Sequence, residues 1–431
     1  MKNSKKLEKK IKEVNKEVFE EINPEKDLPV IEKQLDNFLK KFKRNIRKNS
    51  INTEIFVGGS FAKGTLIKKQ GYDIDIFLRF DKKYSEKEIS KLFPKTLKGF
   101  KKKKVKGSRE YYQIKPAKNI ILEIVPVLKT DNFENARNIT DLSHLHVKYV
   151  NKKTKSKKLK KEIMLAKAFF SGCGCYGAES HIKGFSGYSI ELLVIYYGSF
   201  LKTIKELSKK RKNKIVIDPE KQFKNKKRVL LDINASKLES PIVLIDPTYK
   251  TRNVLAALSN KTFEKFQKCC NNFLKNPKKE FFEKKKKNLN KIKKEAESLG
   301  RSFLLIRIDT KKQEGSVAGT KLLKFYNHLK KEINEYFQVM DSGFNYNQKK
   351  SAKCFFVIGN KKEKLFEGPR IKDVKNRALF EKKHESCFVK GKRIYSKGKV
   401  RVDPKKFLKK WEKNNKKKIK DMYITNLRVI E

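Results

Sequence analysis

Residues 58–65 read Gly-Gly-Ser-Phe-Ala-Lys-Gly-Thr, and after a short loop residues 73–77 read Asp-Ile-Asp-Ile-Phe. The β-prone run 53–57 precedes the first stretch, so the pattern predicts a strand, a glycine turn, a short helix and a second strand. In a strand, residues i and i+2 point to the same face. Asp73 and Asp75 are therefore expected to stand side by side, about 7 Å apart at their Cα atoms, while the residues between them enter the core.

Two neighbouring carboxylates favour a bound cation. Mg²⁺ prefers hard oxygen ligands and retains waters, so a carboxylate pair together with substrate phosphates commonly holds it. A third acid, Glu123, is the only charged residue in the apolar run 120–127, where a charge without a partner is costly. We therefore expect Asp73, Asp75 and Glu123 to be catalytic metal ligands, since two ions roughly 3.5–4 Å apart can support in-line nucleotidyl transfer.

The turn at 58–60 is suited to binding phosphate. Glycines let backbone amides approach phosphate oxygens, the following helix presents free N–H groups, and Ser60 and Lys63 add a hydroxyl and a positive charge. A Gly-Gly-Ser turn or an Asp-x-Asp pair by itself is also typical of ordinary surface structure. Both features in this order, with a third strand acid downstream, favour a catalytic site.

These residues resemble the signature of the polymerase-β-like nucleotidyltransferase superfamily. Segments further along the chain resemble more specifically the archaeal, class I CCA-adding enzymes. Those segments are Lys167 and residues 141–146, 175–179, 184–193, 197–200, 246–247, 252–253 and 367–369.

The resemblance implies a set of residues that hold or approach the incoming CTP or ATP: Ser60, Lys63, Ser143, His146, Lys167, Tyr176 and Arg252. Three alternatives stay open, namely His144 as the phosphate ligand in place of His146, Tyr176 as a core residue, and Arg252 as a surface contact to tRNA phosphate.

The chain departs from the family at two positions. Glu123 stands where the family usually has aspartate, which adds a methylene and shifts the carboxylate. Lys63 stands where arginine is usual, so a point charge replaces a planar bidentate donor that orients phosphate more strictly.

By this resemblance the protein adds and repairs the 3′-terminal CCA of tRNA without a template, using CTP and ATP, and releases pyrophosphate. The implied cofactor is Mg²⁺, and the implied partners are the acceptor arm and 3′ end of tRNA and a second copy of the chain in a homodimer. Two alternatives remain: a poly(A) or oligonucleotide polymerase of the same superfamily, and a noncatalytic basic RNA-binding protein.

Composition agrees with an RNA partner. The 431 residues include 109 Lys and Arg against 48 Asp and Glu, which gives a formal net charge of +61, and 38% of the residues are hydrophobic. A charge of this size needs a polyanion, either nucleic acid or an anionic membrane surface, and nucleic acid is the first expectation. The longest apolar run, 188–200, is interrupted by Glu191 and is too short to span a membrane.

The six cysteines show no disulfide pattern, which predicts a cytoplasmic protein without disulfides. Cys173 and Cys175 are interpreted as small loop residues.

The predicted fold class is α+β with several domains. These are a polymerase-β-like nucleotidyltransferase head at 1–147, a helical central nucleotide-binding domain at 148–275, and an α/β C-terminal body and tail at 276–431 that grips tRNA. Within the last of these we expect a helix at 281–299 and a hairpin that pairs 355–358 with 364–366. Trp411 is expected to anchor a terminal helix rather than stack on RNA.

Overall fold

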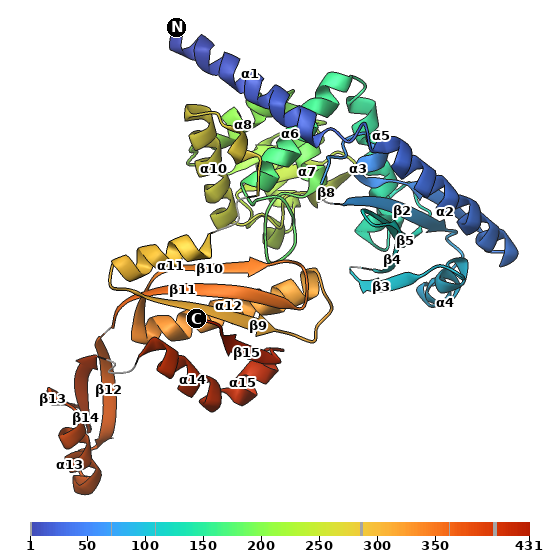
Figure 1. Ribbon diagram of the computed structural model, residues 1–431. Coiled ribbons are helices and arrows are strands. Elements are labelled where there is room, and N and C mark those ends of the chain that lie inside the picture. Colours follow the sequence, from blue (N-terminus) through green and yellow to red (C-terminus); the bar gives the residue numbers. More distant parts are fainter. Residues whose placement is uncertain (1, 70, 108, 285–287, 362, 400–402) are drawn as a thin grey trace. The chain divides into compact units, whose positions relative to one another are not determined.

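The computed structural model describes residues 2–69, 71–107, 109–284, 288–361, 363–399 and 403–431 (Figure 1). The chain forms two compact units, Met1–Lys285 and Lys286–Glu431. Each unit has sheets and buried apolar clusters of its own. Among the described residues, none of the helices combines the length and the apolar character needed to cross a bilayer.

The first unit contains a five-stranded sheet in the order β1-β2-β5-β4-β3. The bounds of these strands are β1 Thr53–Val57, β2 Tyr72–Phe80, β3 Lys102–Lys106, β4 Glu110–Ala117 and β5 Ile120–Leu128. β2 and β5 are parallel, and their register places Asp75 opposite Glu123. Ile74 and Ile76 of β2 are fully buried, so the acids lie on the other face, as the alternation predicts. The predicted strands at 53–57, 73–78 and 120–127 are confirmed.

Helices α2 (Leu28–Lys48) and α4 (Glu86–Thr96) contribute to the core beneath this sheet. α2 is amphipathic, and its buried residues recur every three or four positions, from Ile31 through Phe42 to Ile46. This spacing puts them on one face of the helix, which packs with the isoleucines of β2. The sheet is thereby covered on its apolar face, while the face with the acids stays available for a site.

A helical region with one aromatic-rich core completes the first unit. Its helices are α1 Lys2–Ile22, α5 Ser143–Lys153, α6 Lys157–Gly172, α7 Gly187–Tyr197, α8 Phe200–Ser208, α9 Lys226–Asp232 and α10 Asn260–Lys275. The short helices of the unit are α3 Gly59–Ala62, η1 Phe133–Asn135, η2 Ile139–Leu142, η3 Ala235–Lys237 and η4 Lys279–Phe281. This region also has a three-stranded sheet that the sequence does not predict, β6 Ile215–Ile217, β7 Ile242–Asp246 and β8 Tyr249–Asn253.

The second unit is built on a four-stranded sheet in the order β10-β11-β9-β15. Its strands and helices are β9 Ser302–Asp309, β10 Phe337–Tyr346, β11 Ser351–Lys361, β15 Asn426–Val429, α11 Leu289–Ser298, α12 Ser316–Tyr336, α14 Pro404–Asn414 and α15 Lys416–Asp421. A separate sheet in the order β12-β14-β13 carries α13, with bounds β12 Glu363–Arg370, α13 Val374–Lys383, β13 Cys387–Lys390 and β14 Arg393–Lys399. Trp411 is buried and its indole N–H donates to Glu332 at 2.9 Å, which confirms the anchoring role.

The predicted hairpin between 355–358 and 364–366 is wrong. β11 pairs with β10 on one side and β9 on the other, whereas β12 pairs with β14. Phe355 and Phe356 point to opposite faces of the sheet and pack into two different apolar clusters, so the partners of β11 are set by distant segments and not by the nearby turn. The predicted helix at 281–299 is also too long, because α11 begins at Leu289; residues 285–287 lie outside the described residues.

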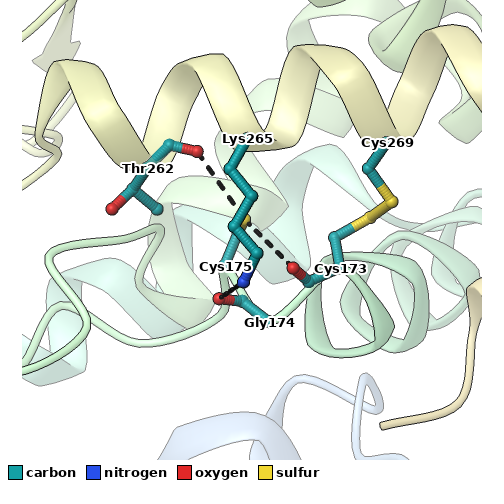
Figure 2. Close-up of a disulfide and its surroundings, with 6 residues drawn as sticks. All are labelled: Cys173, Gly174, Cys175, Thr262, Lys265 and Cys269. Atoms are coloured by element: carbon teal, nitrogen blue, oxygen red, sulfur yellow. Dashed lines mark hydrogen bonds between the residues drawn. A yellow bond between two sulfur atoms is a disulfide. The ribbon is translucent and has the colours of Figure 1, made fainter. Parts of the chain in front are cut away.

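The prediction that the cysteines form no disulfide is wrong as well. Cys173, at the end of α6, is bonded to Cys269 of α10, 96 positions away in the sequence. Figure 2 shows the bond beside Lys265, whose ammonium donates to the carbonyl of Gly174. Cys175 remains a buried free thiol. Two helix segments this far apart in sequence come together only in the folded core, so local spacing gives no sign of the pairing.

Candidate active site

One pocket of about 310 Å³ lies in the first unit and collects many of the predicted residues. Six of them line it: Ser60, Lys63, Asp73, Asp75, Lys167 and Tyr176. Residues of β2 and of the glycine turn thus meet residues of α6 and of the loop before α7. Glu123, Ser143, His146 and Arg252 do not belong to the lining of this pocket.

The glycine turn brings its backbone directly against the acids. Gly59 has a φ of +63°, and a Cβ atom at this position would overlap the carboxylate of Asp75. Any other residue would therefore strain the backbone and displace Asp75. The helix that follows, α3, is a single turn of four residues, so the turn supplies fewer oriented N–H groups than a long helix would.

The carboxylates lie together on one face of the sheet. Asp75 and Glu123 are register partners, and Asp73 is two residues away on the same strand. Burial raises the pKa of Asp75 to about 6, with Asp73 adding to the shift against the opposing effect of Lys63. Burial also raises the pKa of Glu123 to about 7. Asp73 and Asp75 both line the pocket and offer hard carboxylate oxygens, so this pair fits a divalent cation.

Glu123 is held differently from the other two acids. Its Oε1 accepts a hydrogen bond of 2.7 Å from the amide of Gln113, the cross-strand neighbour on β4. In the described part of the chain, no three His, Cys, Asp or Glu side chains gather closely enough to hold a metal ion together. The pair on β2 would thus need oxygens from substrate to complete a metal site, and the role of Glu123 as a ligand stays a prediction.

Lys63 and Lys167 share a buried carboxylate that the sequence analysis did not assign to the site. Glu191 of α7 accepts from Lys63 through Oε2 and from Lys167 through Oε1, each at 2.7 Å. The hydroxyl of Thr65 donates to Oε1 at 2.8 Å. Burial raises the pKa of Glu191, but the two ammonium groups outweigh this effect and lower it to about 2. The carboxylate of Glu191 is therefore ionised between the two lysines.

A second ionic cluster is centred on Asp246 at the end of β7. Arg252 donates to Oδ2 at 2.7 Å, and Nε2 of His146 lies 3.3 Å from the same oxygen. Tyr188 donates to Oδ1 at 3.1 Å, and its ring stacks on His146 with centroids 4.1 Å apart. Tyr188 also lines the pocket, and Nζ of Lys63 lies 5.3 Å from its ring centroid. The predicted pair His146 and Arg252 is thus joined to the pocket through Tyr188.

His144 has a different environment from His146. Its Nε2 lies 2.7 Å from Asp131, and Arg79 also contacts the ring. Burial lowers the pKa of both histidines. His146 alone of the two contacts Asp246 and Tyr188, which favours it over His144 as the residue near the nucleotide. Ser143, the first residue of α5, is half-buried.

Tyr176 is positioned by a backbone bridge. It pairs with Phe185, and its hydroxyl lies so near Gly187 that a Cβ atom there would stand 2.9 Å away. Tyr176 lines the pocket rather than the core alone. Among the residues that sequence reasoning missed, Glu191 had a usable signal, because it is the only acid in the apolar run 188–200. Asp246 belongs to a segment that carries the family resemblance, 246–247, but it was not assigned to the site.

Known families match most of the first unit. Residues 36–168 match a family described as the nucleotidyltransferase domain, and residues 161–283 match the tRNA nucleotidyltransferase second domain. A solved structure of the Cid1 poly (U) polymerase bound to MgATP has a TM-score of 0.51 and 15% identity, over 63% of this chain and 98% of that chain. This likeness concerns the fold alone. The polymerase-β-like fold predicted for the head is confirmed.

Several curated relatives carry the name CCA-adding enzyme. The one from Methanocaldococcus jannaschii is 31% identical over 408 residues, which cover 90% of this chain and 87% of the relative. The one from Saccharolobus solfataricus is 32% identical over 334 residues, or 76% of this chain and 74% of the relative. The one from Nanoarchaeum equitans is 42% identical over 212 residues, and the chain spans 52% of that relative's length.

Proposed function

Because the chain belongs to the CCA-adding enzymes, a family of tRNA nucleotidyltransferases, we propose that its pocket binds CTP or ATP and transfers the nucleotide to the 3′ end of tRNA. The single observation that carries this proposal is the meeting of Ser60, Lys63, Asp73, Asp75 and Tyr176 in one pocket. Addition of CCA is the activity of this family, and these five residues have the chemistry that it needs.

Asp73 and Asp75 would hold the divalent metal that this superfamily uses, and we propose Mg²⁺ because both donors are hard oxygens. When bound, the metal would lower the pKa of the attacking 3′-hydroxyl and stabilise negative charge on the leaving phosphates. Glu123 is proposed as a third acid of this site.

The chain's own groups orient the triphosphate. Ser60 supplies a hydroxyl, and Lys63 and Lys167 supply positive charge at the pocket wall. Tyr176 and His146 are proposed to pack beside the nucleotide, with Ser143 close by. The hydroxyl of tRNA attacks the α-phosphate, pyrophosphate leaves, and the lysines stabilise the charge that develops on it.

Arg252 is proposed to read the base edge. Its guanidinium is fixed by Asp246 and lies 3.4 Å from Nε2 of His146. A planar head with five N–H donors can satisfy acceptors on cytosine or adenine. The ion pair with Asp246 limits the orientations of this head, which favours a reading role over a loose contact to tRNA phosphate.

The remaining parts of the proposal concern the partner and its setting. The acceptor arm of tRNA is an A-form helix that proteins read through phosphates, 2′-hydroxyls and shape, and the lysine-rich second unit is proposed to grip it. We place the reaction in the cytoplasm, where tRNA and nucleotides are available. The homodimer stays a prediction.

A product-length assay tests the proposed function. A tRNA transcript that ends before CCA is incubated with the protein, divalent metal, CTP and ATP, and the products are separated by length. We expect growth by three nucleotides, C, C and A, and then arrest. A long ladder of added nucleotides would instead indicate a polymerase of the same superfamily, and no extension would contradict nucleotidyl transfer.

A further inference from the structure

Glu191 connects two lysines that approach the pocket from different parts of the first unit. Lys63 follows α3, Lys167 lies on α6, and Glu191 lies on α7. All three side chains are buried, with relative exposures of 8% for Lys63, 3% for Lys167 and 1% for Glu191. Each oxygen of the Glu191 carboxylate serves a different lysine at 2.7 Å. One acid therefore fixes the position of both ammonium groups.

The donors of Lys167 are fully used by this arrangement. An ammonium group has three N–H donors. Those of Lys167 meet Glu191 Oε1 at 2.7 Å, the hydroxyl of Thr65 at 2.8 Å and the carbonyl of Thr65 at 3.1 Å. Because these acceptors lie on two different segments, the ammonium group has one position in which all three bonds form.

Two buried ammonium groups would be unfavourable without the carboxylate. Burial lowers the pKa of Lys167 and the neighbouring charge of Lys63 lowers it further, whereas Glu191 raises it. Without Glu191, the two lysine side chains would repel each other. The carboxylate thus offsets this repulsion and holds both lysine side chains at fixed positions.

We propose that Glu191 is a positioning residue for nucleotide binding, which holds the ammonium group of Lys63 where it meets a triphosphate and holds Lys167 as a fixed positive charge beside it. The inference rests on the proposed function, since it takes the pocket as the nucleotide site. It predicts that Glu191 affects CTP affinity through Lys63. A residue that only joined α7 to its neighbours would affect folding stability without this dependence.

A double-mutant cycle on CTP binding tests this role. Equilibrium dialysis with CTP and Mg²⁺, without tRNA, is performed on the wild-type chain, Glu191→Gln, Lys63→Met and the double variant. We expect Glu191→Gln to weaken CTP binding about tenfold in the wild-type background and less than about twofold in the Lys63→Met background, because contacting residues are energetically coupled. Equal weakening in both backgrounds, or no weakening in either, would overturn the role of Glu191.

Two further comparisons keep the test decisive. Glu162→Gln serves as the matched control, because this carboxylate lies on the same helix as Lys167 but accepts from the backbone of Phe200; we expect unchanged CTP affinity. If Glu191→Gln fails to fold, Thr65→Val is compared with Thr65→Ser, because only serine keeps the hydroxyl that bonds to Glu191 and Lys167. Equal CTP affinity of these two variants would overturn the proposal. If the wild-type chain binds no CTP, the proposed function is overturned as well. If it binds CTP but the effects of Glu191→Gln and Lys63→Met on CTP affinity are additive, only the role of Glu191 is overturned.

Discussion

Asp246→Asn is the substitution for which the structure gives the most direct quantitative expectation. Asp246 is fully buried, and its carboxylate accepts from Arg252 at 2.7 Å and from Tyr188 at 3.1 Å. The backbone N–H and the hydroxyl of Thr248 donate to it at 2.9 and 2.8 Å. An asparagine keeps one oxygen for Tyr188 and Thr248, but it turns an N–H₂ group toward the guanidinium. The substitution therefore breaks the ion pair with Arg252 and the contact of His146 with the same oxygen, and it leaves the bonds to Oδ1 in place.

Removing one partner of a buried ion pair costs about 3–5 kcal/mol. The side chain of Arg252 is 28% exposed, and water can hydrate part of the freed guanidinium. We therefore expect the lower end of the range, a loss of about 3 kcal/mol in the free energy of unfolding. In a urea titration with a slope of roughly 3 kcal/mol per molar, the midpoint falls by about 1 M.

The matched control is Asp232→Asn, which removes an exposed ion pair with Arg228 in the same unit. We expect a change within about 0.5 kcal/mol, because exposed pairs contribute little. A loss below about 1 kcal/mol for Asp246→Asn would refute the argument that the buried pair holds this cluster together.

The stabilisation by the ion pair of Asp246 and Arg252 is expected to decrease at low pH. Burial alone would raise the pKa of Asp246, but hydrogen bonds and charges from His146, Arg252 and Thr248 outweigh it and hold the pKa well below the ordinary 3.8. The stabilisation is therefore present above the unfolded pKa and is lost as pH falls toward the folded pKa. We expect the stability difference between the wild-type chain and Asp246→Asn to shrink as the pH falls below 4.

Three further predictions concern the reaction. Asp73→Ala or Asp75→Ala should abolish transfer of labelled CTP with little change in tRNA affinity, because RNA affinity comes mainly from lysine and arginine contacts to phosphate; near-normal turnover of both variants would contradict the metal assignment. Glu123→Asp should keep activity and Glu123→Gln should cripple it, and a fully active Gln variant would show that Glu123 is no ligand. Arg252→Ala should lower CTP and ATP incorporation and raise misincorporation of UTP or GTP at similar tRNA affinity; unchanged fidelity with a shallower salt dependence would place Arg252 on the tRNA-binding surface.

Strand β2 could be predicted from the sequence because the pattern that defines it lies within a few neighbouring residues. Alternation of isoleucine and aspartate fixes which residues enter the core and which face the pocket, and the parallel neighbour β5 then supplies Glu123 at the same level. The turn before it could also be predicted, since Gly59 is required where the backbone meets Asp75. The acids on β2 and the glycine turn before it could therefore be predicted from the sequence.

Features that depend on contacts between distant segments could not be predicted from the sequence. The bond between Cys173 and Cys269 joins two helices, and the apolar run in β11 carries no sign of whether it lies at the centre of a sheet or in a hairpin. Glu191 shows the intermediate case. A lone acid in an apolar helix indicates that a buried partner exists, but only the fold shows that the partners are Lys63 and Lys167.

The charge of the pocket differs from that of the chain as a whole. Among the described residues that line the pocket, three acids, including Glu191, stand against three lysines, whereas the whole chain carries +61. A uniformly basic pocket would attract any phosphate, including the tRNA backbone. The acids on β2 make a bare phosphate chain unfavourable there unless a cation accompanies it. The same carboxylates that would hold a metal thus also favour a metal-bound nucleotide over uncomplexed RNA phosphate in the pocket.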